Sequence, residues 1–411
     1  MREWLPSDHL AWFICDAIDS LNVDALLEKY RVCGKGELAY DPRVLLKVLT
    51  YGYATGVVSS RKIAKAIHEN VAFRVLSYDS FPSHRTICRF RESNLDQFQD
   101  LFVQVLQLAR EAKMVKLGTI AIDGSKVKAD ASKHKAMSYD RMREQEKKLK
   151  AEIKKLTDAA KHADEVEDAE FGPDFRGDEL PKEIARREDR LAVIQAAKKR
   201  LEERKAAEAA EQAKAKGEEV KPADAKPKPK DQENFTDPES RIMKTGSSGF
   251  QQSYNAQVAV DADAQIIVAA QVTQCANDAG QLVPVVNAVF ENTATIPARV
   301  LADSGYRSEA NFEAMSALGI DAYVPLGREG KAHGAVNGTR SSEMARKLET
   351  KLGRARYKAR KSIVEPVFGW VKRVLGFRSF SLRSLKKVQG EWSLVCMALN
   401  LRRLGALSAA K

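Results

Sequence analysis

The sequence predicts an α/β protein in which a mixed β-sheet is flanked by helices, with an all-α domain before it and a charged helical insertion within it. Three observations lead to this prediction. Short apolar runs rich in Val, Ile and Ala are typical of buried strands, and they lie at residues 119–122, 250–260, 265–273, 299–302 and 321–324. Residues 1–115 follow helical spacing instead. From residue 138 to 231 the composition shifts to Lys, Glu, Ala and Arg, as in solvated helices.

The first 115 residues predict a compact helical domain, with helices expected at residues 10–18, 44–49, 61–70, 85–92 and 95–113. Ser83 can cap the fourth of these helices. The third and fourth helices could form a helix-turn-helix-like DNA reader, with basic side chains facing phosphates or bases: Arg61, Lys62, Lys65, Arg85, Arg89 and Arg91. The alternative is an ordinary helical domain whose basic side chains are solvated.

The charged segment predicts two helices, over residues 141–160 and 181–216, separated by a turn-rich break at 171–178. A thin apolar seam formed by Leu191, Ile194 and Leu201 favours packing of the two as a helical hairpin. The Lys- and Pro-rich residues 221–230 are expected to form a mobile loop.

The order of elements is strand, insertion, two strands joined by a turn, helix, strand, helix, strand and a final helix. This is the order of a ribonuclease-H-like fold, which carries its site at the middle of the sheet. Asp123 is expected where the first strand ends, and Asp303 where the fourth strand ends. Neighbouring strands would bring both acids into one pocket. Taken singly, each acid could instead be a turn residue or a helix cap.

A third acid, Glu365, is expected at or near the start of a helix within residues 354–375, where Pro366 marks either a kink or the true helix start. Val364, Val367, Phe368, Val371 and Leu375 form its apolar stripe. A glutamate beside a buried stripe must be paired or metal-bound. The alternative to a metal site is a salt bridge to Arg360 or Lys361.

Composition favours a nucleic-acid partner over a membrane, because the net charge is +12 and no apolar run approaches the length of a membrane span. Five scattered cysteines form no metal knuckle or redox pair and fit a reducing compartment. With no secretory signal visible, a cytoplasmic location is expected.

Several motifs together resemble bacterial insertion-sequence transposases of the DDE group. They are Ile122-Asp123-Gly124-Ser125-Lys126, Asp303-Ser304-Gly305-Tyr306, Glu365-Pro366-Val367-Phe368-Gly369, Tyr254-Asn255-Ala256-Gln257, and the segments at 51–63 and 234–241. The resemblance spans nearly the whole chain. It implies that Asp123, Asp303 and Glu365 form a metal-binding catalytic triad.

The resemblance also implies supporting roles for Tyr357, Arg360 and Lys372, which correspond to the Tyr, Arg and Lys around the family's glutamate. The chain departs from the family here, since four residues rather than three separate Arg360 from Glu365. Lys361 has the usual spacing but is not arginine, so either residue could fill the role. A long charged insertion after the first catalytic strand occurs in only one branch of these enzymes.

Such a triad would hold two Mg²⁺ ions, with Mn²⁺ able to substitute, to activate an attacking oxygen and stabilise a leaving one. The expected function is cutting of DNA at element ends and joining of those ends to target DNA. The expected partners are double-stranded DNA with terminal inverted repeats, target DNA and a second copy of the chain on DNA, in association with the bacterial nucleoid. The alternative is a catalytically silent DNA-binding regulator derived from a transposase.

The expected domain boundaries follow from these elements. Residues 1–115 would form a helical DNA-binding domain, and residues 116–137 and 232–380 the ribonuclease-H-like catalytic domain. Residues 138–231 would form the charged insertion with a mobile linker, and residues 381–411 a C-terminal helix that packs on the catalytic domain.

Overall fold

The computed structural model describes residues 2–30, 39–171, 179–216, 225–245, 249–327 and 338–409. The chain divides into two compact units, which are described separately. The first contains residues 1–129 and 243–411, and the second contains residues 130–242. Of the predicted turn at 171–178 only Phe171 is described, and of the predicted loop at 221–230 the structure describes residues 225–230.

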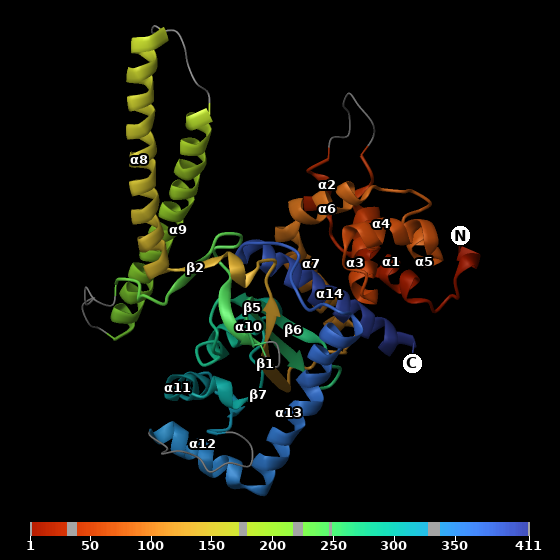
Figure 1. Ribbon diagram of the computed structural model, residues 1–411. Helices are drawn as coiled ribbons and strands as arrows, with labels where there is room; N and C mark the ends of the chain where they lie inside the picture. The colour runs from red at the N-terminus through yellow and green to blue at the C-terminus, as the bar shows by residue number, and fades with distance from the viewer. Residues whose placement is uncertain are drawn as a thin grey trace. The chain divides into compact units, whose positions relative to one another are not determined.

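A mixed β-sheet forms the centre of the first unit, as expected (Figure 1). Its strands follow the order β4-β5-β1-β7-β8, and β6 also pairs with β5. Their bounds are β1 Thr119–Lys128, β4 Arg241–Thr245, β5 Gly249–Asp261, β6 Ile267–Thr273, β7 Arg299–Ala302 and β8 Asp321–Tyr323. β1 is antiparallel to β5 and parallel to β7, so the strands that precede Asp123 and Asp303 are neighbours.

The first strand is longer than the sequence predicts, because β1 continues through Asp123 and Gly124 to Lys128. The polar second half of β1 stays in the sheet by pairing with β5, from Gly124 opposite Gln257 to Lys128 opposite Ser253. Its pairing with β7 ends earlier, at Ile122 opposite Ala302. The expectation that the strand ends at Asp123 is therefore wrong for its β5 side and holds only for its β7 side.

The N-terminal helices pack around a long C-terminal helix, α14 (Leu385–Ala409), which contacts α1, α3, α7 and β6. These helices are α1 Leu10–Ser20, α2 Asp24–Leu27, α3 Pro42–Thr55, α4 Ser60–Glu69, α5 Val71–Leu76, α6 His84–Ser93 and α7 Leu95–Glu111. Ser83 caps α6 by accepting a hydrogen bond from the Thr86 N–H, as expected. Trp392 of α14 is fully buried, and its Nε1 donates to the Gln257 carbonyl of β5. The helical region and the sheet therefore share one core.

Four further helices follow β6: α10 Leu282–Thr293, α11 Glu309–Ala317, α12 Thr339–Glu349 and α13 Lys351–Gly369. Glu365 lies in the penultimate turn of α13, so the expectation that it stands near a helix start is wrong. Pro366 is tolerated inside the helix although it has no N–H for the carbonyl of Ser362. That carbonyl instead accepts a hydrogen bond of 2.8 Å from Gln265 Nε2. A π-helical turn, Trp370–Val374, follows α13.

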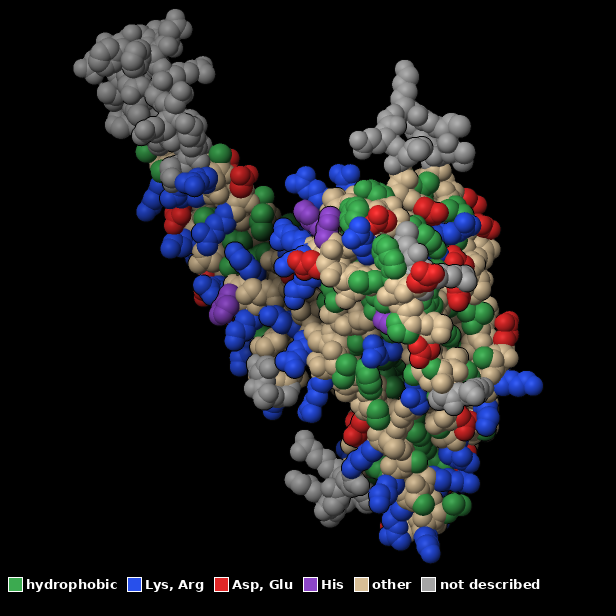
Figure 2. All heavy atoms as spheres, turned by 90° about the vertical axis from the view of Figure 1, so that its right-hand side faces the viewer, with side chains coloured by type: hydrophobic (Ala, Val, Ile, Leu, Met, Phe, Trp, Pro, Cys, Tyr) green, Lys and Arg blue, Asp and Glu red, His purple; other side chains and the backbone are tan. Residues whose placement is uncertain are grey.

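The second unit contains α8 (Tyr139–Phe171) and α9 (Glu179–Lys216), with the short strands β2 (Ala136–Ser138) and β3 (Gln232–Asn234). α8 and α9 pack on each other through an apolar cluster of Met142, Leu149, Ile194 and Ala197. Lys and Arg side chains are scattered along the described part of this unit with Asp and Glu among them (Figure 2).

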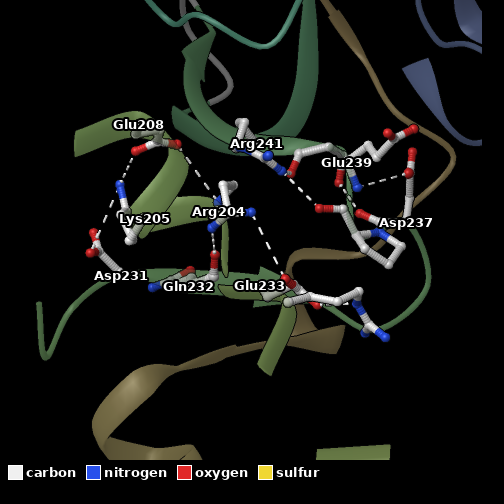
Figure 3. Close-up of polar contacts among 12 residues, drawn as sticks. Arg204, Lys205, Glu208, Asp231, Gln232, Glu233, Asp237, Glu239 and Arg241 are labelled. Carbon is white, nitrogen blue, oxygen red and sulfur yellow. Dashed lines mark hydrogen bonds and ion pairs between the residues drawn. The ribbon is translucent and has the colours of Figure 1, made fainter. Parts of the chain in front are cut away.

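Ion pairs join α9 to β3 in the second unit. Arg204 donates to the Gln232 carbonyl at 3.1 Å and lies 3.9 Å from the carboxylate of Glu233, which is almost fully buried (Figure 3). The turn that follows β3 is fixed by its own polar groups, since the Glu239 N–H donates to Asp237 and Arg241 donates to the Pro238 carbonyl. The family-like segment at 234–241 is therefore a hydrogen-bonded turn.

Candidate active site

Asp123 and Asp303 are placed by two parallel neighbours, β1 and β7. Each acid comes directly after the last residue of the β1–β7 ladder, so both lie at the same end of that strand pair. Asp123 Oδ1 accepts a hydrogen bond of 2.8 Å from the Gly124 N–H. Asp303 caps a short helical turn, Ser304–Tyr306, by accepting a hydrogen bond of 2.8 Å from the Gly305 N–H.

Burial makes ionisation of Asp123 unfavourable. Its side chain is 20% exposed, and burial raises the pKa of its carboxyl from 3.8 to about 6. The negative charge of Asp303 contributes to this rise, while Arg360 and the Gly124 N–H oppose it. Because Asp123 and Asp303 directly follow the paired residues Ile122 and Ala302, their charges lie near each other. A buried carboxylate next to a second acid is a site that favours a bound cation.

Arg360 lies between Asp123 and Glu365. Its guanidinium is 3.2 Å from Asp123 Oδ2 and 3.5 Å from Glu365 Oε1, and its side chain is almost fully buried. Tyr357 hydrogen-bonds to Arg360, so two of the three supporting residues implied by the resemblance act together. Lys361 is exposed, and the geometry therefore favours Arg360 over Lys361 as the residue that supports the acids.

Glu365 and Lys372 have different surroundings. The Glu365 side chain is 51% exposed. Lys372 lies in the π-helical turn and hydrogen-bonds to Ser125 Oγ and, at 3.3 Å, to the Lys126 carbonyl. Burial lowers the pKa of the Lys372 ammonium, and the positive charge of Lys126 adds to this effect. Lys372 thus supports β1 directly rather than pairing with Glu365.

Carboxylate oxygens are the available metal ligands at this site, and they suit Mg²⁺ or Mn²⁺ better than zinc. Within the described ranges, no three His, Cys, Asp or Glu side chains form a ready-made metal-binding group. Arg360 instead bridges Asp123 and Glu365 through its two guanidinium nitrogens. Asp123 and Asp303 therefore offer oxygen donors of the kind that a divalent cation prefers, while Glu365 is paired with Arg360.

Sequence reasoning missed Asp278, which lies in the loop between β6 and α10. Its Oδ1 accepts hydrogen bonds from Asn255 Nδ2 at 2.6 Å, Gln257 Nε2 at 2.7 Å and Lys126 Nζ at 3.2 Å. Asn255 and Gln257 are fully buried on β5. The available signal was two amide side chains inside an otherwise apolar strand, since buried polar groups require partners.

A basic cavity of about 890 Å³ opens beside β1 in the first unit. Six of its lining residues are cationic and none is acidic: Lys126, Lys128, Lys244, Lys372, Arg373 and Arg378. Gly124 and Ser125 also line the cavity, so it begins one residue from Asp123. Lys126 belongs to one of the family-like motifs and Lys372 was named from the resemblance, whereas Lys128 and Lys244 were not singled out from the sequence.

The basic residues of the N-terminal helices divide into two groups. Arg61 and Lys62 on α4 and Arg85 and Arg89 on α6 are exposed. Arg91 is buried, and it donates to the Tyr53 hydroxyl at 3.1 Å and the Val58 carbonyl at 3.3 Å. The prediction that Arg91 faces DNA is therefore wrong, because this side chain joins α6 to α3 inside the core.

No helix in the described part of the chain is long and apolar enough to cross a membrane. Comparison with known families gives two matches. Residues 219–401 match the family described as Transposase DDE domain, and residues 1–93 match the family described as Transposase domain (DUF772). The first match includes Asp303 and Glu365, while Asp123 lies between the two matched ranges. No curated protein and no solved structure matches. The two family matches place the chain among the insertion-sequence transposases of the DDE group.

Proposed function

We propose that this transposase uses Asp123, Asp303 and Glu365 as its catalytic carboxylates, with two Mg²⁺ ions as the cofactor. The observation that supports the proposal is the partly buried carboxylate of Asp123, which lies beside Asp303 where the pairing of β1 with β7 ends. Keeping two acids together in a partly buried site raises their free energy unless a cation compensates their charge. When bound, the metal ions would activate the attacking oxygen and stabilise the leaving oxygen of a phosphodiester.

The residues around the acids have distinct roles in this proposal. Asp123, Asp303 and Glu365 would hold the metal ions. Arg360 holds Asp123 and Glu365 at hydrogen-bonding distance, and Tyr357 orients Arg360. Because the Glu365 side chain is half exposed on α13, its carboxylate would be accessible to DNA and metal. Strand transfer then uses the 3′-hydroxyl freed by the first cut as nucleophile.

The basic cavity supports a path for the DNA backbone beside the acids. Six cations line the cavity, and one of them, Lys126, pairs with Asp278. Lysine and arginine side chains at such spacing neutralise phosphates and release counterions. Lys372 contacts Ser125, two residues after Asp123. It would therefore bind a DNA phosphate close to Asp123. The exposed cations of α4 and α6, Arg61, Lys62, Arg85 and Arg89, would contact DNA further from the acids.

The domain roles follow from this assignment. Residues 1–115 would bind element ends that carry terminal inverted repeats, and residues 116–137 and 232–380 would cut and join DNA. The insertion at 138–231 would stabilise a homodimer assembled on DNA. The C-terminal helix at 381–411 would stabilise the catalytic core. The protein would act on the bacterial nucleoid in the cytoplasm.

The proposal is tested by nicking of DNA that carries the ends of the element. The wild-type protein should nick this DNA with Mg²⁺ or Mn²⁺ and not with EDTA. Asp123→Asn should abolish nicking and retain DNA binding, while Asp263→Asn serves as a control because that carboxylate is half exposed and 4.0 Å from Lys116. Unchanged nicking by Asp123→Asn would show that the catalytic assignment is wrong. DNA binding without nicking by the wild type would indicate the regulator instead.

A further inference from the structure

A buried polar cluster lies next to the two strand-end acids. The Asp278 cluster consists of Asp278, Lys126, Asn255, Gln257 and Tyr306, and all five residues belong to the first unit. Lys126 and Asn255 are opposite each other in the β1–β5 ladder, as are Gly124 and Gln257. Their side chains therefore lie on one face of the sheet, where Asp278 accepts hydrogen bonds from Lys126, Asn255 and Gln257.

The cluster continues to the segment that carries the second acid. The Tyr306 hydroxyl donates a hydrogen bond to Gln257 Oε1, and Tyr306 is fully buried. Asn311 Nδ2 donates to the Ala279 carbonyl and to the Tyr306 carbonyl, both at 2.6 Å. The loop of Asp278 and the turn of Asp303 are therefore tied together by side-chain and backbone contacts.

Two glycines of the catalytic motifs leave space for this cluster. A Cβ atom on Gly124 would lie 2.2 Å from Gln257 Nε2 and 2.8 Å from Asp278 Oδ1. A Cβ atom on Gly305 would lie 2.9 Å from Asp303 Oδ1 and 3.5 Å from Asp278 Oδ2. Asp278 thus fits between the residue after Asp123 and the turn that begins at Asp303.

This contact matters because the sheet does not fix the distance between the acids. Pairing of β1 with β7 ends at Ile122 and Ala302, immediately before Asp123 and Asp303. Beyond that point β1 stays with β5, whereas the chain after Asp303 leaves the sheet as a short helical turn. Two neighbouring acids repel each other, so without a second connection their separation would increase.

We propose that Asp278 is a positioning residue that holds Asp303 at a fixed distance from Asp123 through Gln257 and Tyr306. The inference rests on the proposed metal-binding function of the two acids. Asp278 itself does not bind metal, because Lys126, Asn255 and Gln257 already donate to its carboxylate. It acts on metal affinity in the way that outer residues orient metal ligands, and loss of such a residue lowers affinity by roughly 10- to 100-fold.

The test uses the full chain and Mn²⁺ alone as the probe, with binding followed by electron paramagnetic resonance and by the Mn²⁺-dependent shift in unfolding temperature. Asp278→Asn removes the negative charge of the carboxylate that accepts hydrogen bonds from Lys126, Asn255 and Gln257. Tyr306→Phe removes only the hydroxyl that donates to Gln257. Both variants should require roughly 10- to 100-fold more Mn²⁺ for half-saturation, and Tyr306→Phe should leave DNA affinity in EDTA unchanged. Tyr323→Phe is the matched control, since this buried tyrosine of β8 donates to Asp321 rather than to the cluster.

The pair of substitutions also tests whether the cluster acts as a unit. The double variant should lose little more Mn²⁺ affinity than the stronger single variant, because both changes break the same connection. Wild-type Mn²⁺ affinity in both single variants would overturn the positioning role while leaving the metal site intact, provided that Asp123→Asn abolishes Mn²⁺ binding. Failure of the wild type to bind Mn²⁺ would overturn the proposed metal site as well. If Asp278→Asn does not fold, Tyr306→Phe against Tyr323→Phe still decides the outcome.

Discussion

Asp123→Asn should stabilise the metal-free protein although it should abolish catalysis. Burial raises the pKa of Asp123 from 3.8 to about 6, so the folded state binds a proton more tightly than the unfolded state does. A tenfold change in proton affinity corresponds to about 1.4 kcal/mol, and the ionised carboxylate therefore costs the folded state about 3 kcal/mol at pH 8. Asparagine is neutral at every pH and avoids this cost, while Arg360 keeps its contact with Glu365.

The sign of the pH dependence follows from the same pKa. Between pH 4 and pH 6 the folded wild type holds a proton that the unfolded chain has lost, so its free energy of unfolding decreases as pH rises through this window. The free energy of unfolding of Asp123→Asn should exceed that of the wild type only slightly at pH 4 and by about 3 kcal/mol above pH 7.

Urea unfolding in EDTA at pH 4, 6 and 8 measures this difference, with Asp263→Asn as the control for loss of one exposed carboxylate. Added Mn²⁺ should stabilise the wild type and not Asp123→Asn, because only the wild type retains the Asp123 carboxylate as a metal ligand. Equal or lower stability of Asp123→Asn at pH 8 in EDTA would refute the reasoning, since it would mean that ionised Asp123 is already compensated within the chain.

Three further predictions concern the surroundings of the acids. Arg360→Ala should lower metal-dependent nicking by roughly 10- to 100-fold, and Lys361→Ala should change it little; equal losses in a nicking assay would contradict the choice of Arg360. Gly124→Ala should lower the free energy of unfolding by about 1–3 kcal/mol in urea, because its Cβ would overlap Gln257, whereas Gly118→Ala has open space and should not. Lys244→Ala should reduce the slope of log DNA affinity against log salt concentration by about 1 relative to wild type, and an unchanged slope would exclude its contact with phosphate.

Local sequence patterns predicted most of the architecture. The apolar runs identified the main strands, and helical spacing identified the N-terminal helices, because both patterns reflect which side of an element is buried. The family-like motifs selected Asp123, Asp303 and Glu365, which single-residue reasoning could not separate from turn or cap residues. The short strands β2, β3 and β4 and the short helices α2 and α5 were not predicted, since few residues carry each signal, and helix α12 was not predicted either.

Other features depended on contacts between segments remote in the sequence. The position of Glu365 inside α13 requires Gln265, whose side chain satisfies the carbonyl that Pro366 leaves free. Arg91 is buried because it contacts Tyr53 from another helix. Its spacing from the other basic residues of α6 gave no sign of this contact, so it was wrongly expected at the surface. Arg360 could be preferred to Lys361 only once its contacts with Asp123 and Glu365 were known.

The sequence by itself determined the kind of protein, the acids and the strands that carry them, because hydrophobic periodicity and short motifs are properties of neighbouring residues. Only the tertiary structure decided what surrounds those acids: Arg360 between two of them, the cations of the basic cavity beside them, and Asp278 behind them. Each of these is a contact between charges brought together by the fold, and the energy of a charge depends on its distance from other charges and from water. Such distances are set by the packing of the whole unit, which no local pattern records.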